Sequence, residues 1–181
     1  MLQFFKMFKK QTNLDCAKLV GKKVQLTGWV HNRRDHGKII FIDLRDRSGI
    51  VQLVFLPDKT QTYQKAKKLG PEDVILVSGK VNPRPKGMEN PNLPTGNVEV
   101  EVETLEILAK AETPPFELDK DTRKVDEAIR LKYRYLDLRT ERLKNHLQKR
   151  HEVNLFIRNW LSKKGFWEIE TPILTKSTPE G

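Results

Sequence analysis

Cysteine is almost absent from this chain, whose 181 residues include a single one, Cys16. One thiol excludes an internal disulfide and a metal site built on clustered cysteines. The four histidines, at positions 31, 36, 146 and 151, are too scattered to replace them. His146 and His151 lie five residues apart on a predicted helix, outside the usual i, i+4 spacing of metal ligands. We therefore expect no metal site, and the single thiol is typical of a reducing, cytoplasmic environment.

Long apolar runs are also missing, so the sequence predicts no membrane span and no membrane partner. The opening segment, MLQFFKMFKK, is basic and apolar but is not followed by a small-residue cleavage site, which argues against a secretory signal. The chain contains no GxxxxGK phosphate loop and no nucleophile pair.

Positive charge is in excess, with 34 Lys and Arg against 24 Asp and Glu, and it is unevenly distributed. Residues 121–164 carry 13 basic and 6 acidic side chains, whereas residues 61–120 carry 8 basic and 10 acidic ones. A second basic cluster lies in HNRRDHGK, residues 31–38. This distribution fits a polyanion contacted at two places, although high pI is also common in proteins without a nucleic-acid partner.

Three short strands are predicted between Val24 and Leu56, because apolar residues alternate with others there. The alternating sets are Val24, Leu26 and Val30; Ile40, Ile42 and Leu44; Val51, Leu53 and Phe55. HNRRDHGK is expected to be a basic loop between the first two strands. DRSG is expected to be a tight turn between the last two, with Gly49 supplying the positive φ.

The outward face of these strands carries residues suited to single-stranded bases. If Ile40, Ile42 and Leu44 face a core, Phe41, Asp43 and Arg45 face outward, and Gln52 faces outward beside them. An exposed ring stacks on a base, an amide pairs with a base edge, and arginines neutralise phosphate. The alternative is that Phe41 covers a second apolar layer, Gln52 is solvated, and Arg33 and Arg34 are ordinary loop charges.

The next part of the sequence completes a barrel. Residues 58–69 predict a short helix that closes one end of the barrel and is ended by Gly70 and Pro71. A fourth strand is predicted from Val74 to Val81 and a fifth from Val98 to Leu108, separated by an exposed, proline-rich loop. Five strands with a helix between the third and fourth form the mainly β, partly α pattern of an OB-fold barrel.

The amino-acid pattern changes after Ala109 and no longer predicts strands. Thr113, Pro114 and Pro115 mark a boundary, and residues 116–124 are expected to be an extended connector with little to bury. A long amphipathic helix follows, with Thr140 as its predicted cap and Gly165 at its end. The residues after the predicted helix, 166–181, are too few to cover its apolar side. We therefore expect that the domain to which the helix belongs is truncated. The apolar residues are Leu143, Leu147, Val153, Phe156, Ile157, Trp160 and Leu161.

Three segments resemble one known family. RLKYRYLDLR (130–139) and GFWEIETPILTKSTPEG (165–181) are similar to the hinge and the first class II motif of bacterial-type aspartyl-tRNA synthetases, of subclass IIb. GWVHNRRDHGKIIFIDLRDRSGIVQLVF is similar to their anticodon-binding barrel. The resemblance implies an N-terminal fragment with an anticodon-binding OB-fold domain (1–111), a linker or hinge (112–139), and a truncated start of the catalytic domain with a long helix and a strand (140–181).

The resemblance also implies roles for single residues on the barrel. The aromatic matching Phe41 stacks on the middle anticodon base, Gln52 matches the residue that reads this base, and Arg34 matches one near the first base. Arg84 and Asn90 match loop residues near the anticodon, and Glu99 matches a carboxylate that reads the third base. Against the role of Glu99, its neighbours Glu101 and Glu103 are expected to be solvated. Asn32 and Asn82 stand where the family often has arginine.

His36 departs from the pattern of strict family members, which often have leucine there. Similar enzymes with histidine at this position tend to accept tRNA(Asn) as well as tRNA(Asp). The other interpretation is a polar residue at a loop tip, and the sequence leaves both open.

At the other end of the chain, Pro172 matches the proline of the first class II motif, which implies a homodimer interface. Glu180 matches a loop carboxylate that approaches the amino-acid substrate.

The family's reaction joins aspartate to tRNA(Asp) through aspartyl-adenylate, with ATP and Mg²⁺ as cofactors. It uses arginines of two later motifs, which this sequence lacks, so the 181 residues alone are expected to be inactive although the full enzyme is an aspartate-tRNA ligase. Two rivals remain: a stand-alone OB-fold module for single-stranded nucleic acid, and a fragment of an asparaginyl- or lysyl-tRNA synthetase. Comparing a hairpin that contains GUC with a random single strand would separate the stand-alone module from the synthetase interpretation.

Overall fold

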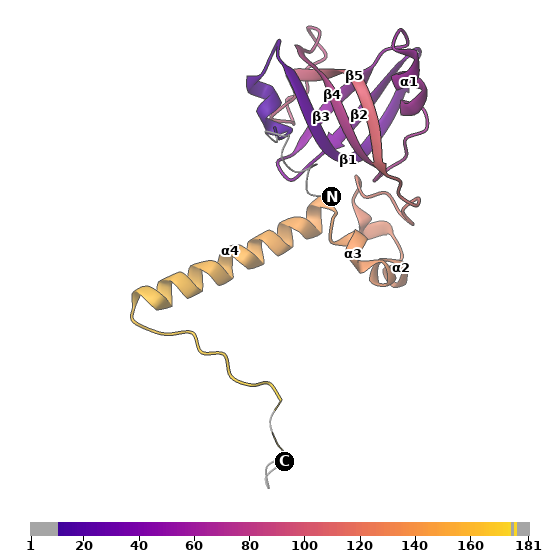
Figure 1. Ribbon diagram of the computed structural model, residues 1–181. Helices are drawn as coiled ribbons and strands as arrows, with labels where there is room; N and C mark the ends of the chain where they lie inside the picture. Colours follow the sequence, from indigo (N-terminus) through magenta and orange to yellow (C-terminus); the bar gives the residue numbers. More distant parts are fainter. Residues whose placement is uncertain (1–10, 175, 177–181) are drawn as a thin grey trace.

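The computed structural model describes residues 11–174 and 176. Its elements in chain order are a 3-10 helix (Leu14–Lys18), strands β1 (Lys23–His36), β2 (Ile39–Arg45) and β3 (Ile50–Phe55), helix α1 (Thr60–Ala66), strands β4 (Val74–Pro83) and β5 (Val98–Ala109), a 3-10 helix (Thr122–Lys124), and helices α2 (Glu127–Lys132), α3 (Arg134–Asp137) and α4 (Glu141–Lys163). The strands form one compact unit, α2 and α3 lie beneath it, and α4 extends away from it (Figure 1).

The five strands close into a barrel in the order β1-β2-β3-β5-β4, which confirms the predicted OB-fold architecture. Strand β1 makes the closure possible because it pairs with β4 along its first half and with β2 along its second half. Its register shifts between Val30 and Asn32, so a bulge bends the strand between its two partners. Among these five strands, only the short β3 and β5 pairing is parallel.

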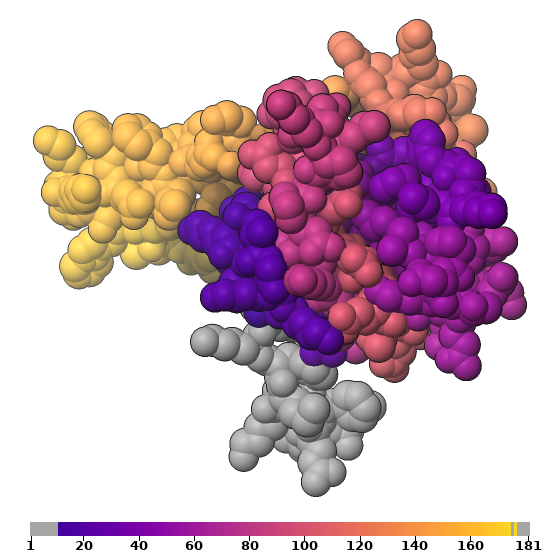
Figure 2. Space-filling view, turned by 90° about the horizontal axis from the view of Figure 1, so that it is seen from above, coloured from indigo at the N-terminus to yellow at the C-terminus, as the bar shows by residue number. Residues whose placement is uncertain are grey.

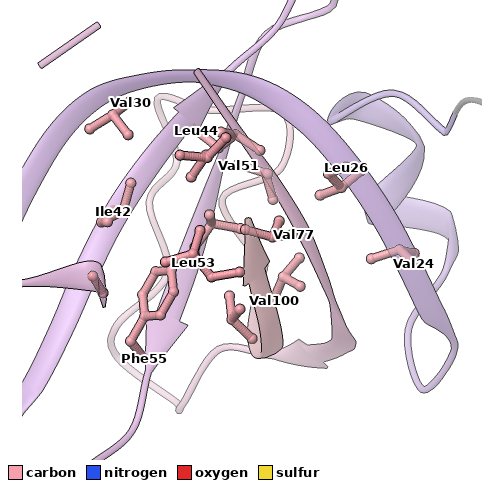
Figure 3. Packing of buried hydrophobic residues seen from close by; sticks show 14 of the residues in the cluster. Val24, Leu26, Val30, Ile42, Leu44, Val51, Leu53, Phe55, Val77 and Val100 are labelled. Carbon is pink, nitrogen blue, oxygen red and sulfur yellow. The ribbon is translucent and has the colours of Figure 1, made fainter. Parts of the chain in front are cut away.

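The barrel interior is the hydrophobic core, and it contains the residues that the alternating pattern predicts. Val30, Ile42 and Leu53 are fully buried, together with Val77 and Val100 from the last two strands (Figure 3). Ala66 at the end of α1 and Leu69 just after it are buried in the same core, which confirms a helix closing the barrel. Burial of this many aliphatic side chains is the main source of stability in a small domain.

The segment HNRRDHGK is not a loop, contrary to our expectation. Strand β1 continues to His36, and Arg33 and Arg34 pair in register with Ile42 and Phe41 of β2. Only a tight turn at Gly37 and Lys38 remains, with Gly37 at φ 60°. The pairing of β1 with β2 continues beyond the residues whose apolar side chains alternate, because main-chain hydrogen bonds do not depend on side-chain type.

The turn between β2 and β3 forms as predicted. Gly49 has φ 148°, in the region that favours glycine. Asp46 stabilises the turn because its Oδ1 accepts hydrogen bonds from the backbone N–H groups of Ser48 and Gly49, at 2.7 and 3.1 Å.

Residues 116–124 are not an extended connector with little to bury, as we expected. Phe116 and Leu118 are 8% and 7% exposed, and they line a pocket that also includes His31 and Asn32 of β1. Two apolar residues at alternate positions give this segment one buried face. Farther on, the hydroxyl of Thr122 donates to buried Asp137 at 2.6 Å, which ties the segment to α3.

Helix α4 begins and ends where the sequence predicts, but its N-cap residue is bonded differently. Thr140 occupies the N-cap position without a side-chain cap, because its hydroxyl donates to the carbonyl of Asp137 at 2.7 Å. At the other end, Gly165 has φ 85°, and Phe166 N–H bonds to the carbonyl of Leu161 in a Schellman arrangement. The helix therefore stops at its glycine, as expected.

The apolar side of α4 has no cover within the described residues. Figure 2 shows the helix protruding to one side of the barrel. Its exposed apolar residues include Leu147, Val153, Phe156, Ile157 and Trp160. Residues 166–174 form no strand, which corrects that part of our expectation, because a strand requires a partner strand and none lies beside them among the described residues. Among the described helices, none combines the length and hydrophobicity needed to cross a membrane.

Candidate nucleic-acid interface

A row of polar residues crosses all five strands on the outer face of the barrel. Neighbouring strands pair Asn32 with Asp43, Asp43 with Gln52, Gln52 with Glu99, and Glu99 with Asn82. Asp43, Gln52 and Glu99 face outward because the adjacent residues on their strands lie in the core. The closure of the barrel thus aligns residues that are far apart in the sequence.

Hydrogen bonds connect the centre of this row. Nη2 of Arg34 donates to Oδ1 of Asp43 at 2.8 Å and to Oε1 of Gln52 at 3.3 Å. Nε2 of Gln52 in turn donates to Oε2 of Glu99 at 3.0 Å. Arg34 and Glu99 cover Gln52, so only 7% of it is exposed. The sequence had predicted an exposed side chain at this position. We call Arg34, Asp43, Gln52 and Glu99 the outer-face network.

Phe41 lies on the same face, directly opposite Arg34 in the β1 and β2 pairing. Its ring is half-buried rather than fully exposed, and the ring of His36 packs edge-on against it with 5.8 Å between ring centres. The partly open aromatic surface next to the network can stack on a planar base. His36 thus borders this aromatic surface, a contact that the sequence alone did not predict.

Charge and burial are balanced within the network. Burial raises the pKa of Asp43, and Arg34, His31 and Arg84 oppose the rise. Burial also raises the pKa of Glu99, against the hydrogen bond from Gln52 and the charge of Arg84. Two carboxylates and two arginines are therefore close enough to influence each other at this surface.

The loop between β4 and β5 adds Arg84 to this surface but uses Asn90 to hold itself together. Nε of Arg84 donates to the carbonyl of Val98 at 3.1 Å, which keeps its guanidinium beside β5. Oδ1 of Asn90 accepts a hydrogen bond from the backbone N–H of Asn92 at 3.0 Å. The backbone of Asn90 also contacts Gly96 closely, where a Cβ would lie 1.8 Å from the Asn90 carbonyl oxygen. Arg84 therefore faces the network, whereas Asn90 shapes the loop.

Three charged residues make contacts that the sequence did not predict. Arg33 donates to the carbonyl of Leu69 at 3.1 Å, next to the end of α1, so of the two neighbouring arginines only Arg34 joins the network. Glu101 accepts hydrogen bonds from Lys59 and Asn82 at 2.7 and 3.1 Å, and Glu103 pairs with Lys23 at 2.8 Å. Both glutamates stay partly exposed to solvent, as expected, but each is also paired with a side chain of a neighbouring element.

Two further predicted residues belong to the segment after α4 and not to the barrel. Pro172 is exposed in the segment that follows α4. Glu180 is outside the described residues. The structure thus groups Arg34, His36, Phe41, Gln52, Arg84 and Glu99 on one surface and separates Pro172 from them.

A second polar cluster, which the sequence did not indicate, joins the barrel to the segment after it. The carboxylate of buried Glu72 forms ion pairs with Arg45 at 2.9 Å and with Arg139 at 2.6 Å. Arg139 also lies over the ring of Trp29. Glu72 has φ 66°, an uncommon value for a residue other than glycine, asparagine or aspartate. We call these four residues the junction cluster.

The chemistry available on the outer face is recognition. Within the described ranges, no group of three or more His, Cys, Asp or Glu side chains is placed to hold a metal ion. A ring for stacking, an amide with fixed orientation, and arginines in a hydrogen-bonded row are the groups that protein surfaces use to bind unpaired bases.

Family models match both parts of the chain. Residues 24–108 match the model described as "OB-fold nucleic acid binding domain". Residues 126–181 match the model described as "tRNA synthetases class II (D, K and N)". The first match covers the barrel and the outer-face network, and the second includes α2, α3 and α4.

Curated relatives share more than half of the aligned residues. The chain is 57% identical over 163 residues to an aspartate-tRNA(Asp/Asn) ligase of Halothermothrix orenii, covering 90% of this chain and 28% of the relative. It is 56% identical over 171 residues to the ligase of the same name from Syntrophomonas wolfei, covering 94% and 29%. It is 51% identical to an aspartate-tRNA ligase of Staphylococcus carnosus, covering 90% and 28%. The chain thus spans under a third of the length of these relatives.

Solved structures agree with the sequence matches. Asparaginyl-tRNA synthetase from Pyrococcus horikoshii, complexed with asparaginyl-adenylate, superposes with a TM-score of 0.77 and 33% identity over 92% of this chain and 37% of that protein. Aspartyl tRNA synthetase from Entamoeba histolytica has the same fold, with a TM-score of 0.81, 21% identity, and coverage of 94% and 41%. Given this barrel, the two family models and the identity to its curated relatives, the chain belongs to the aspartyl-tRNA synthetase family of class II synthetases.

Proposed function

We propose that the outer face of the barrel binds the anticodon of a transfer RNA. The single observation that carries this proposal is the outer-face network next to Phe41. In this arrangement Phe41 stacks on the middle base, Gln52 presents its amide to the edge of that base, and Arg34 presents its guanidinium toward the first base. Glu99 and Arg84, farther along the same surface, are placed for neighbouring nucleotides.

We further propose that the full-length protein is an aspartate-tRNA ligase. The curated relatives with this name support the proposal, and the chain spans under a third of their length. The full reaction would use ATP and Mg²⁺ to form aspartyl-adenylate and pass the aminoacyl group to tRNA. We assign neither ATP nor Mg²⁺ to any residue of the described chain. An enzyme of translation would act in the cytoplasm.

We propose that this ligase accepts tRNA(Asn) as well as tRNA(Asp). Two relatives at 56% and 57% identity carry the name aspartate-tRNA(Asp/Asn) ligase, and His36 is the residue to which we assign the relaxed choice. Its edge-on contact with Phe41 supports the assignment because it places His36 at the border of the stacking surface.

For the C-terminal part we keep the roles that the family implies. The barrel domain (1–111), the hinge (112–139) and the start of the catalytic domain (140–181) are the proposed units. The exposed apolar side of α4 and Pro172 are proposed to contribute to a homodimer interface of the full-length protein. Glu180, outside the described residues, is proposed to approach the amino-acid substrate.

Binding of short RNA hairpins tests the anticodon proposal directly. The 181-residue chain is expected to bind a hairpin with a GUC loop more tightly than the same stem with a scrambled loop, measured by fluorescence anisotropy at fixed salt. Phe41→Ala should weaken GUC binding by about 1 to 3 kcal/mol because one stacked base loses its partner. Met88→Ala, a change at an exposed residue of the loop between β4 and β5, is the control and should have little effect.

Two results would contradict the proposals. Equal affinity for GUC, scrambled and random single strands would favour a sequence-independent OB-fold module. For the full-length enzyme, strong preference for tRNA(Asp) over tRNA(Asn) in aminoacylation would contradict the relaxed choice. The 181 residues alone are expected to give no ATP-pyrophosphate exchange above background.

A further inference from the structure

Asp43 stands at the centre of the outer-face network, although a carboxylate is unfavourable on a surface that binds a polyanion. Its side chain is 17% exposed and lies in contact with Arg34. The resemblance to known synthetases assigned it no role. An acidic group that is largely covered and close to the proposed base-binding ring needs a local explanation.

Asp43 determines the direction of the Arg34 side chain. In the strand register Arg34 lies opposite Phe41, yet its guanidinium bonds diagonally to Asp43, two residues farther along β2. Arg34 is not among the cations that lie over an aromatic ring in the described residues. The bond to Asp43 therefore draws the guanidinium toward Gln52 and away from the face of Phe41.

The hydrogen-bond donors of Arg34 are divided between the protein and the surface. The two N–H groups of Nη2 are used by Asp43 and Gln52. Nη1 and Nε make no hydrogen bond to any described residue, and the side chain is 44% exposed. The same contacts fix the orientation of the Gln52 amide, because Arg34 must donate to Oε1 and Glu99 must accept from Nε2.

We propose that Asp43 is a positioning residue for base recognition: by holding Nη2 of Arg34, it directs the other donors of Arg34 toward the bound RNA and, through Arg34, the Gln52 amide toward the base stacked on Phe41. This inference rests on the proposed anticodon-binding function. Asp43 itself need not touch RNA. It acts on specificity, by restricting two side chains to one arrangement before RNA binds.

Positioning and simple electrostatics predict opposite results when the charge of Asp43 is removed. If Asp43 only repels RNA, Asp43→Asn should tighten binding to every hairpin equally. If Asp43 positions Arg34 and Gln52, the variant should bind the matching hairpin less tightly and mismatched hairpins as tightly or more tightly. The informative quantity is therefore the ratio of two dissociation constants.

The experiment compares a GUC hairpin with a GAC hairpin on the same stem, which differ only in the middle base. We expect the unchanged chain to prefer GUC, and Asp43→Asn to reduce the ratio of the two Kd values at least fivefold. Asp35→Asn is the matched control, because Asp35 is exposed and pairs with Arg33 outside the network. It should leave the ratio unchanged.

A double substitution distinguishes positioning from general loss of structure. Arg34→Lys keeps the charge but replaces the planar guanidinium, so it should lower the ratio, and adding Asp43→Asn should lower it little further. Thermal unfolding of each variant reports its stability separately. If Asp43→Asn does not fold, Asp43→Glu replaces it, and its displaced carboxylate should also lower the ratio.

Distinct outcomes overturn the two proposals. A ratio that stays unchanged in Asp43→Asn or Asp43→Glu, or a parallel weakening of both hairpins, would show that Asp43 does not position the network. The anticodon proposal would survive that result as long as the unchanged chain prefers GUC. If the unchanged chain does not distinguish GUC from GAC, the anticodon proposal fails first.

Discussion

At the scale of single residues, burial and hydrogen bonding separate side chains that look equivalent in the sequence. Glu99, Glu101 and Glu103 alternate along one strand, yet Glu99 bonds to Gln52, Glu101 to Lys59 and Glu103 to Lys23. The local pattern places all three on the outer face and cannot tell which of them joins a network. Only Glu99 is opposite Gln52 in the pairing of β3 with β5.

Glu99 provides a pH-dependent prediction. Because burial raises its pKa in the folded chain above that of the unfolded chain, the folded chain binds this proton more tightly. The contribution of Glu99 to the free energy of unfolding therefore falls as pH rises from below the unfolded pKa, about 4.3, through the folded pKa. Glu99→Gln cannot ionise, so the free energy of unfolding of this variant should not show that decline. We therefore expect the difference in melting temperature, variant minus unchanged chain, to be more positive at pH 7 than at pH 4.

Thermal unfolding of both chains at the two pH values provides the measurement. Glu106→Gln is the matched control, because Glu106 lies exposed on the same strand. A Glu99→Gln difference that is the same at pH 4 and pH 7 would contradict the prediction. In hairpin binding at pH 7, the same variant should lose affinity for GUC, since the acceptor charge next to Gln52 is gone.

At the scale of elements, close backbone contacts close the barrel. Strand β4 pairs with β1 on one side and β5 on the other, and its register shifts between Ser78 and Gly79. A Cβ at Gly79 would lie 2.2 Å from the carbonyl oxygen of Glu101, and one at Gly28 would lie 2.4 Å from that of Arg45. Glycine is therefore required at these positions by the approach of a neighbouring strand, not by φ.

This contact predicts that Gly79→Ala destabilises the barrel by about 1 to 3 kcal/mol, because β5 must move to accept the methyl group. The free energy of unfolding in urea measures the effect. Gly37→Asn is the control: Gly37 has φ 60° with open space around it, and asparagine tolerates this conformation, so the cost should be below about 1 kcal/mol. Equal costs for the two variants would show that the close approach of β5 to Gly79 does not limit stability.

At the scale of the whole molecule, the junction cluster connects the barrel to the helices after it. Arg45 comes from β2, Glu72 precedes β4, and Arg139 follows α3. Burial of Phe116 and Leu118 strengthens the same connection. The segment between the barrel and α4 is therefore packed against the barrel, whereas α4 itself extends away with its apolar side exposed (Figure 1).

Arg139→Ala should loosen this connection without changing the barrel. The variant loses an ion pair to Glu72 and the contact with Trp29, but Arg45 still neutralises Glu72. Because Arg139 is partly exposed, we expect a cost of about 1 kcal/mol. Hydrogen exchange should rise in residues 110–139, with GUC hairpin affinity unchanged within about twofold.

Arg123→Ala is the control, because Arg123 is an exposed arginine whose ion pair is with nearby Asp121. It should change neither exchange in the barrel nor hairpin affinity. Faster exchange throughout β1 to β5 in Arg139→Ala would show instead that the junction cluster stabilises the barrel itself.

The sequence by itself determined most of the five barrel strands, the core and the two ends of α4. Alternation placed Ile42, Leu44 and Leu53 in the interior, and Gly49 and Gly165 marked a turn and a helix end, because these signals depend on neighbours within a few residues. The family likeness also followed from linear motifs, and the comparisons confirmed it.

The tertiary structure decided how these elements meet. In the folded chain, Arg34 contacts both Gln52 and Asp43. Arg33 instead bonds next to the end of α1, and Glu72 forms an ion pair with Arg139. Each contact links residues whose distance is set by barrel closure and strand register. A sequence pattern with a period of two reports which face a residue occupies, but it does not report which residue lies across from it.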